Sequence, residues 1–210
     1  MMRHVIWDFD GTLFDTYPYL AEALGQALEL HGAHEERAAI AERFMDCESA
    51  AIAHFADKYA LGEQLRRDYF ECKQRGDLGM VRPFTGAREA CQAVIDAGGH
   101  NYILTHRDDT ARDIVDMCGM SGLFREIVTS ANGFPRKPDP TAIRYLMERY
   151  GMDRSETMIV GDRELEVELG RRAGIVSCFF DNGTARCDTR PDITVRSLSE
   201  IADMAKGAAL

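Results

Sequence analysis

Six short apolar runs recur along the chain with helical stretches between them, as in an alternating α/β protein. Most runs are continuous rather than alternating in polarity, which is typical of strands buried on both faces of a parallel sheet. The runs cover residues 5–7, 102–104, 126–128, 158–160, 176–180 and 192–195. Helix starts are readable between and after them, among them Asp139 followed by Pro140 and the capping box from Ser197 to Glu200. The pattern predicts a doubly wound parallel sheet.

One stretch breaks this alternation, because no convincing strand lies between residues 15 and 83. Apolar side chains there recur at helical spacing and predict about four helices whose apolar faces pack against each other. These positions are Leu20, Leu24, Ala27, Leu28, Ile40, Phe44, Ile52, Phe55, Tyr59, Leu65, Tyr69 and Cys72. We therefore expect an α/β core domain over 1–15 and 84–210, with residues 16–83 inserted as a helical subdomain.

Composition narrows the class of protein. The 210 residues are 45% hydrophobic and 29% charged, as in an ordinary globular domain, and the formal net charge is −10. An acidic chain repels nucleic acid phosphates and anionic lipid, so we expect neither nucleic acid nor a membrane as a partner. An anionic substrate would therefore need a local cationic site or a metal ion.

The cysteines and the start of the chain bear on location. The six cysteines are scattered without a CxxC pair, a spacing that argues against a zinc site. Met1 to His4 lead at once into the first apolar run, with no secretory segment, and no apolar run reaches the ~18 residues of a membrane span. These features predict a cytoplasmic protein with reduced thiols.

Two acidic motifs follow predicted strands. Asp8 and Asp10 end the first run and face the same way along an extended strand, while Gly11 and Thr12 allow a sharp turn with backbone N–H groups for an anion. Asp162 follows the fourth run, with Glu166 four residues later. Capping of the following helices is the alternative interpretation of either motif.

Strands one and four are neighbours across the switch point of a doubly wound sheet, where ligands bind. We therefore expect Asp162 to lie beside Asp8 and Asp10. Hard oxygen donors beside an anion suit Mg²⁺.

Polar side chains also follow the second run and precede the fourth. Thr105 and His106 stand at the end of the second run, where a hydroxyl and N–H groups can hold a phosphate oxygen. His106 and Arg107, which comes next, are expected to face solvent, with added donors to the phosphate as the alternative. Lys137, between Arg136 and Pro138, is the best-placed cation to offset the carboxylates and a phosphate.

In order, Asp8-Phe9-Asp10-Gly11-Thr12, Thr105, Lys137 and Gly161-Asp162 through Glu166 resemble the four motifs of the haloacid dehalogenase-like superfamily. The resemblance spans almost the whole chain, the helical cap included. The run Asp15-Thr16-Tyr17-Pro18 resembles phosphoglycolate phosphatase-type members, which have proline in the same place.

The resemblance implies a Mg²⁺-dependent phosphatase acting on a small phosphorylated metabolite. Asp8 would be the nucleophile, forming an aspartyl-phosphate, and Asp10 the general acid/base. The metal would be held by Asp8, the backbone carbonyl of Asp10, and Asp162. Thr105, Lys137 and N–H groups near Gly11 would stabilise the phosphoryl oxygens, with Thr12 and His106 as further phosphate-binding candidates.

Some features depart from the family pattern or leave alternatives. The second acid of the fourth motif is usually Asp, whereas Glu166 stands here, so it would reach the metal directly or through water. Glu164 is a spare candidate. Leu20 stands where the sugar-phosphate mutases have His, which counts against a phosphotransferase or phosphomutase without removing it. A catalytically inactive phospho-binding member is the other alternative, and a monomer and a homodimer are both compatible with the sequence.

Overall fold

The computed structural model describes residues 2–44, 47–183 and 187–207. The chain divides into two compact units, Asp15–Arg82 and the combination of Met1–Phe14 with Pro83–Leu210. The short strands β2 (Phe14–Asp15) and β3 (Arg82–Pro83) pair with each other where the chain passes from one unit to the other. Each unit has its own buried core and is described separately.

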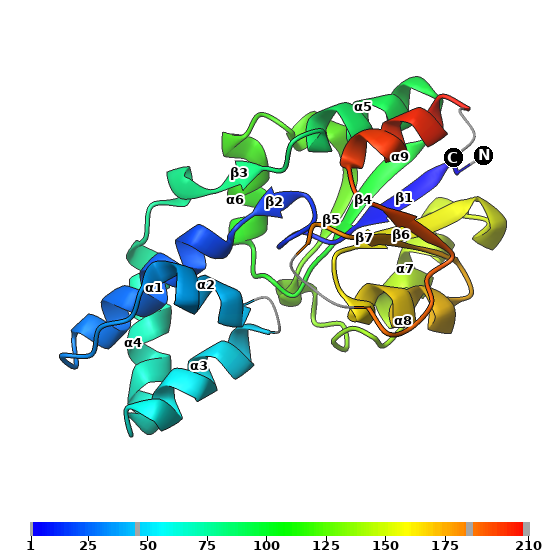
Figure 1. Ribbon diagram of the computed structural model, residues 1–210. Coiled ribbons are helices and arrows are strands. Elements are labelled where there is room, and N and C mark those ends of the chain that lie inside the picture. Colours follow the sequence, from blue (N-terminus) through cyan, green and yellow to red (C-terminus); the bar gives the residue numbers. More distant parts are fainter. Residues whose placement is uncertain (1, 45–46, 184–186, 208–210) are drawn as a thin grey trace. The chain divides into compact units, whose positions relative to one another are not determined.

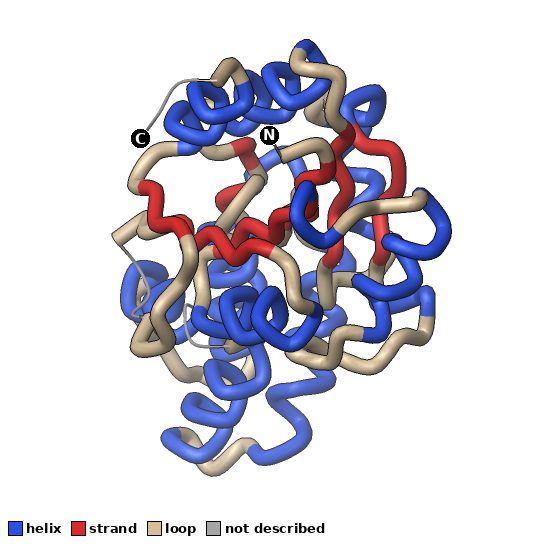
Figure 2. The backbone as a smooth tube through the Cα atoms, turned by 90° about the vertical axis from the view of Figure 1, so that its right-hand side faces the viewer, coloured by secondary structure: helices blue, strands red, loops and turns tan. Residues whose placement is uncertain are grey.

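The larger unit is built on a six-stranded sheet in the order β5-β4-β1-β6-β7-β8, in which every neighbouring pair is parallel (Figures 1 and 2). Its strands are β1 (His4–Trp7), β4 (His100–Leu104), β5 (Phe124–Val128), β6 (Thr157–Gly161), β7 (Val176–Phe180) and β8 (Ile193–Val195). Each predicted apolar run falls on one of them. All residues of β1 and β6 are buried, because both flanks of the central strands are paired and both faces are covered.

Helices cover both faces of this sheet (Figure 1). The helices α5 (Ala87–Asp96) and α9 (Leu198–Ala205) lie on one face, and α7 (Thr141–Tyr150) and α8 (Glu164–Ala173) on the other. The helix α6 (Thr110–Met117) connects β4 to β5. Single 3₁₀ turns complete the unit: η2 (Ser121–Leu123), η3 (Ser130–Asn132) and η4 (Arg154–Glu156). The predicted doubly wound α/β fold is confirmed.

The structure confirms the helix start predicted at Ser197 and moves the one predicted at Asp139 by one residue. Ser197 caps α9, and Glu200 accepts from the Ser197 backbone N–H at 2.8 Å, as predicted. The helix α7 begins one residue later than predicted, at Thr141, with Pro140 in the capping position. Asp139 instead accepts from the Thr141 N–H at 2.9 Å, so its side chain closes the turn before the helix.

The smaller unit contains four α-helices among its described residues, as the periodicity predicted. They are α1 (Tyr17–Glu29), α2 (Arg37–Phe44), α3 (Glu48–Lys58) and α4 (Gly62–Arg75), followed by the 3₁₀ turn η1 (Leu78–Met80). Leu24, Ile40, Phe55, Leu65 and Tyr69 from all four helices are at most 3% exposed and form its core. The role of this unit as a cap stays a prediction.

Within the described residues, no helix has the length and apolar character needed to cross a bilayer.

Candidate active site

Three buried carboxylates meet at the carboxyl ends of β1 and β6. The Asp8 N–H donates to the Val160 carbonyl at 2.9 Å and so continues the pairing of these strands. Asp8, Asp162 and Glu166 each place a carboxylate oxygen within 4.8 Å of the other two, and each is at most 2% exposed. Parallel pairing explains this convergence, since it brings strand ends that lie far apart in the sequence to one edge of the sheet.

Two cations accompany these carboxylates. The Lys137 side chain is 2% exposed, and its ammonium group donates to Asp8 Oδ1, to Glu166 Oε1 at 2.7 Å and to the Leu104 carbonyl at 3.2 Å. The Arg163 guanidinium lies 4.0 Å from Asp8 Oδ2 and 3.9 Å from Glu166 Oε1, and is 23% exposed. Lys137 is thus directed inward, as its position between Arg136 and Pro138 predicted.

The carboxylates fit a divalent cation. Asp8 Oδ2 and Glu166 Oε2 are buried and have no hydrogen-bond partner among the described residues. A buried anionic oxygen without a donor is costly, and a metal ion would satisfy it. Asp162 Oδ1 accepts from the Thr12 hydroxyl at 3.1 Å, which fixes that carboxylate. Hard oxygen donors of this kind suit Mg²⁺.

Burial and neighbouring charges shift the pKa values of the three carboxylates. Burial raises the pKa of Asp8 to about 6, although Lys137 opposes the shift. Burial and the Asp8 charge raise the pKa of Asp162 to about 7. Burial would also raise the pKa of Glu166, but Lys137 and Arg163 outweigh it and hold that pKa below its usual value. The cluster therefore resists full ionisation unless more positive charge is supplied.

Asp10 lies apart from this trio. Its carboxylate is not among the three that come together in the described part of the chain. Instead, Asp10 Oδ1 accepts from Arg107 Nε at 3.1 Å and from Nη2 at 2.6 Å. Arg107 is therefore buried, so the expected solvent-facing position is wrong, and its donors serve Asp10.

Gly11 and Thr12 have their own local partners. Gly11 adopts a φ of 83°, which a side chain would strain, and its N–H donates to the Phe14 carbonyl at 3.0 Å. This particular N–H is therefore engaged within the turn. The Thr12 hydroxyl is fully buried against Asp162. Phosphate binding by these two residues stays a prediction.

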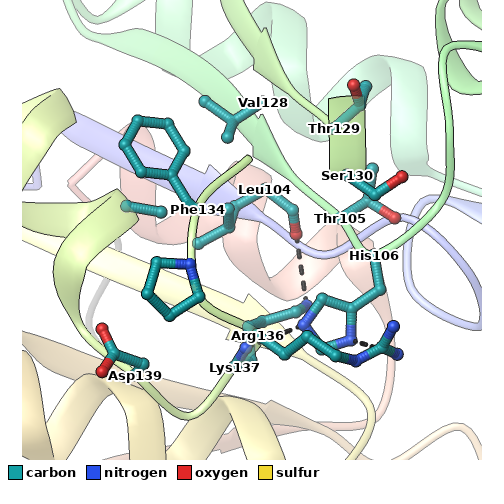
Figure 3. Close-up of a pocket in the computed structure, with 12 residues that line it drawn as sticks. Leu104, Thr105, His106, Val128, Thr129, Ser130, Phe134, Arg136, Lys137 and Asp139 are labelled. Carbon is teal, nitrogen blue, oxygen red and sulfur yellow. Dashed lines mark hydrogen bonds between the residues drawn. The ribbon is translucent and has the colours of Figure 1, made fainter. Parts of the chain in front are cut away.

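At the end of β4, the Thr105 hydroxyl accepts from the Arg107 N–H at 3.0 Å, which leaves the hydroxyl proton for another acceptor. The His106 ring lies against the loop that carries Lys137, and Nε2 accepts from the Lys137 N–H at 2.8 Å (Figure 3). Burial, with Lys137 and Arg136 nearby, lowers the pKa of His106 to about 3. The ring is therefore neutral near pH 7.

A cavity of about 150 Å³ is lined by Lys137, Thr105 and His106 and by the apolar side chains of Val128 and Phe134 (Figure 3).

The spare candidate Glu164 is engaged elsewhere, since its Oε1 accepts from the Thr189 N–H at 2.8 Å. Sequence reasoning gave Arg107 only as a possible added donor and did not identify Arg163 as a member of the site. Arg107 lies two residues after Thr105, and Arg163 directly follows Asp162, which is the signal that the sequence offers.

Comparison with known proteins agrees with this geometry. A family model described as haloacid dehalogenase-like hydrolase matches residues 5–180. A phosphoglycolate phosphatase from Aquifex aeolicus is 25% identical over 209 residues, covering 97% of this chain and 96% of that protein. An N-acetylmuramic acid 6-phosphate phosphatase from Pseudomonas aeruginosa is 27% identical over 216 residues, covering 97% and 94%. A solved haloacid dehalogenase-like hydrolase from Streptococcus pneumoniae gives a TM-score of 0.82 at 18% identity, covering 97% and 98%.

With acidic motifs at the ends of β1 and β6 and a family match over most of its length, the chain belongs to the haloacid dehalogenase-like hydrolases. The resemblance inferred from the motifs is confirmed. Its curated relatives are phosphatases, and the chain is a phosphatase of this family.

Proposed function

We propose that this phosphatase hydrolyses a small organic phosphomonoester of the phosphoglycolate type, with Mg²⁺, through an aspartyl-phosphate on Asp8. The observation that carries the proposal is the buried Asp8 carboxylate. Lys137 holds its Oδ1, while Oδ2 has no hydrogen-bond partner among the described residues. Oδ1, which Lys137 orients, would then be the oxygen that attacks phosphorus, and Oδ2 would be left for the metal ion.

The reaction has two steps. In the first, an Asp8 carboxylate oxygen bonds to phosphorus as the ester P–O bond breaks, and Asp10 gives a proton to the departing alkoxide. In the second, water attacks the phosphorus of the aspartyl-phosphate, Asp10 takes the proton of that water, and inorganic phosphate leaves with Asp8 restored. Thr105 and Lys137 donate to the phosphoryl oxygens in both steps.

The carboxylates of Asp8 and Asp162, the Asp10 backbone carbonyl and, directly or through water, Glu166 would hold Mg²⁺. When bound there, the ion would offset the negative charge that Asp8 and the phosphoryl group bring together. The two unpartnered oxygens of Asp8 and Glu166 support this assignment.

The substrate class is supported by the relatives. The named phosphatases act on phosphoglycolate and on N-acetylmuramic acid 6-phosphate, both phosphate esters of organic acids. We therefore place phosphoglycolate first among candidates. The proposal covers cleavage to inorganic phosphate, so transfer to an alcohol or sugar is the competing outcome.

A panel of esters assayed for phosphate release tests this function. Phosphoglycolate, a sugar 6-phosphate and p-nitrophenyl phosphate would each be incubated with Mg²⁺ and with EDTA. Removing the metal is expected to cost about 4 kcal/mol in the barrier, a rate loss of roughly a thousandfold, which readded Mg²⁺ restores. Rates that are unchanged in EDTA would contradict the metal assignment. A phosphorylated product on added glycerol would favour the transferase alternative.

A smaller effect on activity is expected from replacing His106. Replacing it with Ala removes the acceptor of the Lys137 N–H, which should cost about 1 kcal/mol and lower kcat/KM by roughly fivefold. Because the pKa of His106 lies at about 3, the ratio of wild-type to variant kcat/KM should be constant over the neutral pH range. A ratio that changes with an inflection near pH 6.5, the ordinary pKa of His, would show that a charged His106 binds the phosphate.

A further inference from the structure

Arg107 is an arginine buried at the catalytic edge of the sheet with a rigidly held backbone. Its side chain is 2% exposed. Its N–H donates to the Thr105 hydroxyl at 3.0 Å, and its carbonyl accepts from the Ser130 N–H at 2.9 Å. The guanidinium lies 5.6 Å from the centre of the Phe9 ring, a cation–π contact that further limits its motion.

This guanidinium donates twice to one oxygen of Asp10. Nε and Nη2 both donate to Asp10 Oδ1, at 3.1 and 2.6 Å. Charge-assisted hydrogen bonds from a planar guanidinium group are short and directional, so these two bonds fix the orientation of the Asp10 carboxylate. The Asp10 side chain, in contrast, is 26% exposed, so part of it is accessible.

We propose that Arg107 is the positioning residue of the general acid/base. It fixes, through Oδ1, the orientation in which the Asp10 carboxylate gives the proton to the leaving group and takes the proton from water. This inference rests on the proposed function, which makes Asp10 the acid/base. Arg107 acts through Asp10 and makes no contact with the substrate.

The choice of leaving group separates this role from two others. An alkoxide leaving group needs protonation, whereas p-nitrophenolate leaves without it. Loss of acid positioning therefore slows cleavage of alkyl phosphates and spares the first step with p-nitrophenyl phosphate. If Arg107 bound the substrate phosphate, KM would rise for both esters. If it only stabilised the fold, both rates would fall together with the melting temperature.

The variants are Arg107→Ala and Arg107→Lys. Arg112→Ala is the matched control, since Arg112 is 46% exposed and pairs with Asp109 outside the site. Cleavage of phosphoglycolate and the burst of p-nitrophenolate would be measured for each, with melting temperatures and with added guanidinium ion.

For Arg107→Ala we expect kcat on phosphoglycolate to fall about a hundredfold, while the p-nitrophenolate burst changes by less than about tenfold. The burst should be followed by slow turnover, because Asp10 also serves the second step. Arg107→Lys should be intermediate, and guanidinium ion should restore part of the Ala variant's activity. Equal losses on both esters, or a loss confined to KM, would overturn the inference.

If Arg107→Ala does not fold, Arg107→Lys supplies the same comparison between the two esters. A wild-type protein that cleaves no phosphomonoester would instead refute the proposed function itself. A wild-type protein that cleaves both esters, with variants that lose both equally, would refute only the role of Arg107.

Discussion

Asp8→Asn is expected to lower kcat on any cleaved phosphomonoester by on the order of 10⁴-fold or more, because the amide cannot form the covalent intermediate. The shape of the side chain is retained, and one of three carboxylates within 4.8 Å of one another loses its charge. Burial already opposes that charge, raising the pKa of Asp8 to about 6. The variant should therefore fold, with a melting temperature within a few degrees of wild type.

The measurement is steady-state phosphate release together with a thermal melt, and intact mass after acid quenching should show added phosphate on the wild-type protein alone. Asp96→Asn is the control, since Asp96 is exposed at the end of α5 and bonds only Gln92 among the partners described for it. That variant should keep full activity. Near-normal turnover by Asp8→Asn would remove Asp8 from the role of nucleophile.

The sheet could be predicted because burial on both faces demands continuous apolar strands, and six such runs mark six strands. The placement of Asp8 beside Asp162 followed from the same logic, since strand order fixes which ends are neighbours. The start of α7 was predicted one residue early. The signals of Asp139 and Pro140 specify a turn and a helix start together, and only the backbone conformation decides which residue serves which.

The environment of Arg107 could not be predicted, since its partner Asp10 lies 97 residues away in the sequence. Its direction depends on the turn in which the Thr105 hydroxyl accepts the Arg107 N–H, and no pattern of polarity specifies that turn. The partner of Glu164 could not be predicted either. Its charge and position suited a metal, but it accepts from the Thr189 N–H instead. Local patterns locate the motifs, whereas these side-chain partners follow from tertiary packing.

Lys137 should matter for both stability and rate, because its ammonium is buried between Asp8 and Glu166. Lys137→Met keeps much of the side-chain bulk and removes the charge, leaving two buried carboxylates without their donor. Breaking a buried ion pair from one side costs about 3–5 kcal/mol in the free energy of unfolding. Loss of a donor to the phosphoryl oxygens should also lower kcat by roughly 10²–10³-fold.

The double variant Lys137→Met/Glu166→Gln separates the two effects. Removing one carboxylate charge as well should recover a large part of the lost unfolding free energy in urea titrations, while kcat stays low because no ammonium group is restored. Lys73→Met is the matched control. Lys73 pairs with Glu48 in the helical unit, where the side chains are 14% and 40% exposed, so its loss should cost at most about 1 kcal/mol. A Lys137→Met protein as stable as wild type would show that Lys137 is not needed to balance the buried acids, and the charge argument for this site would fail.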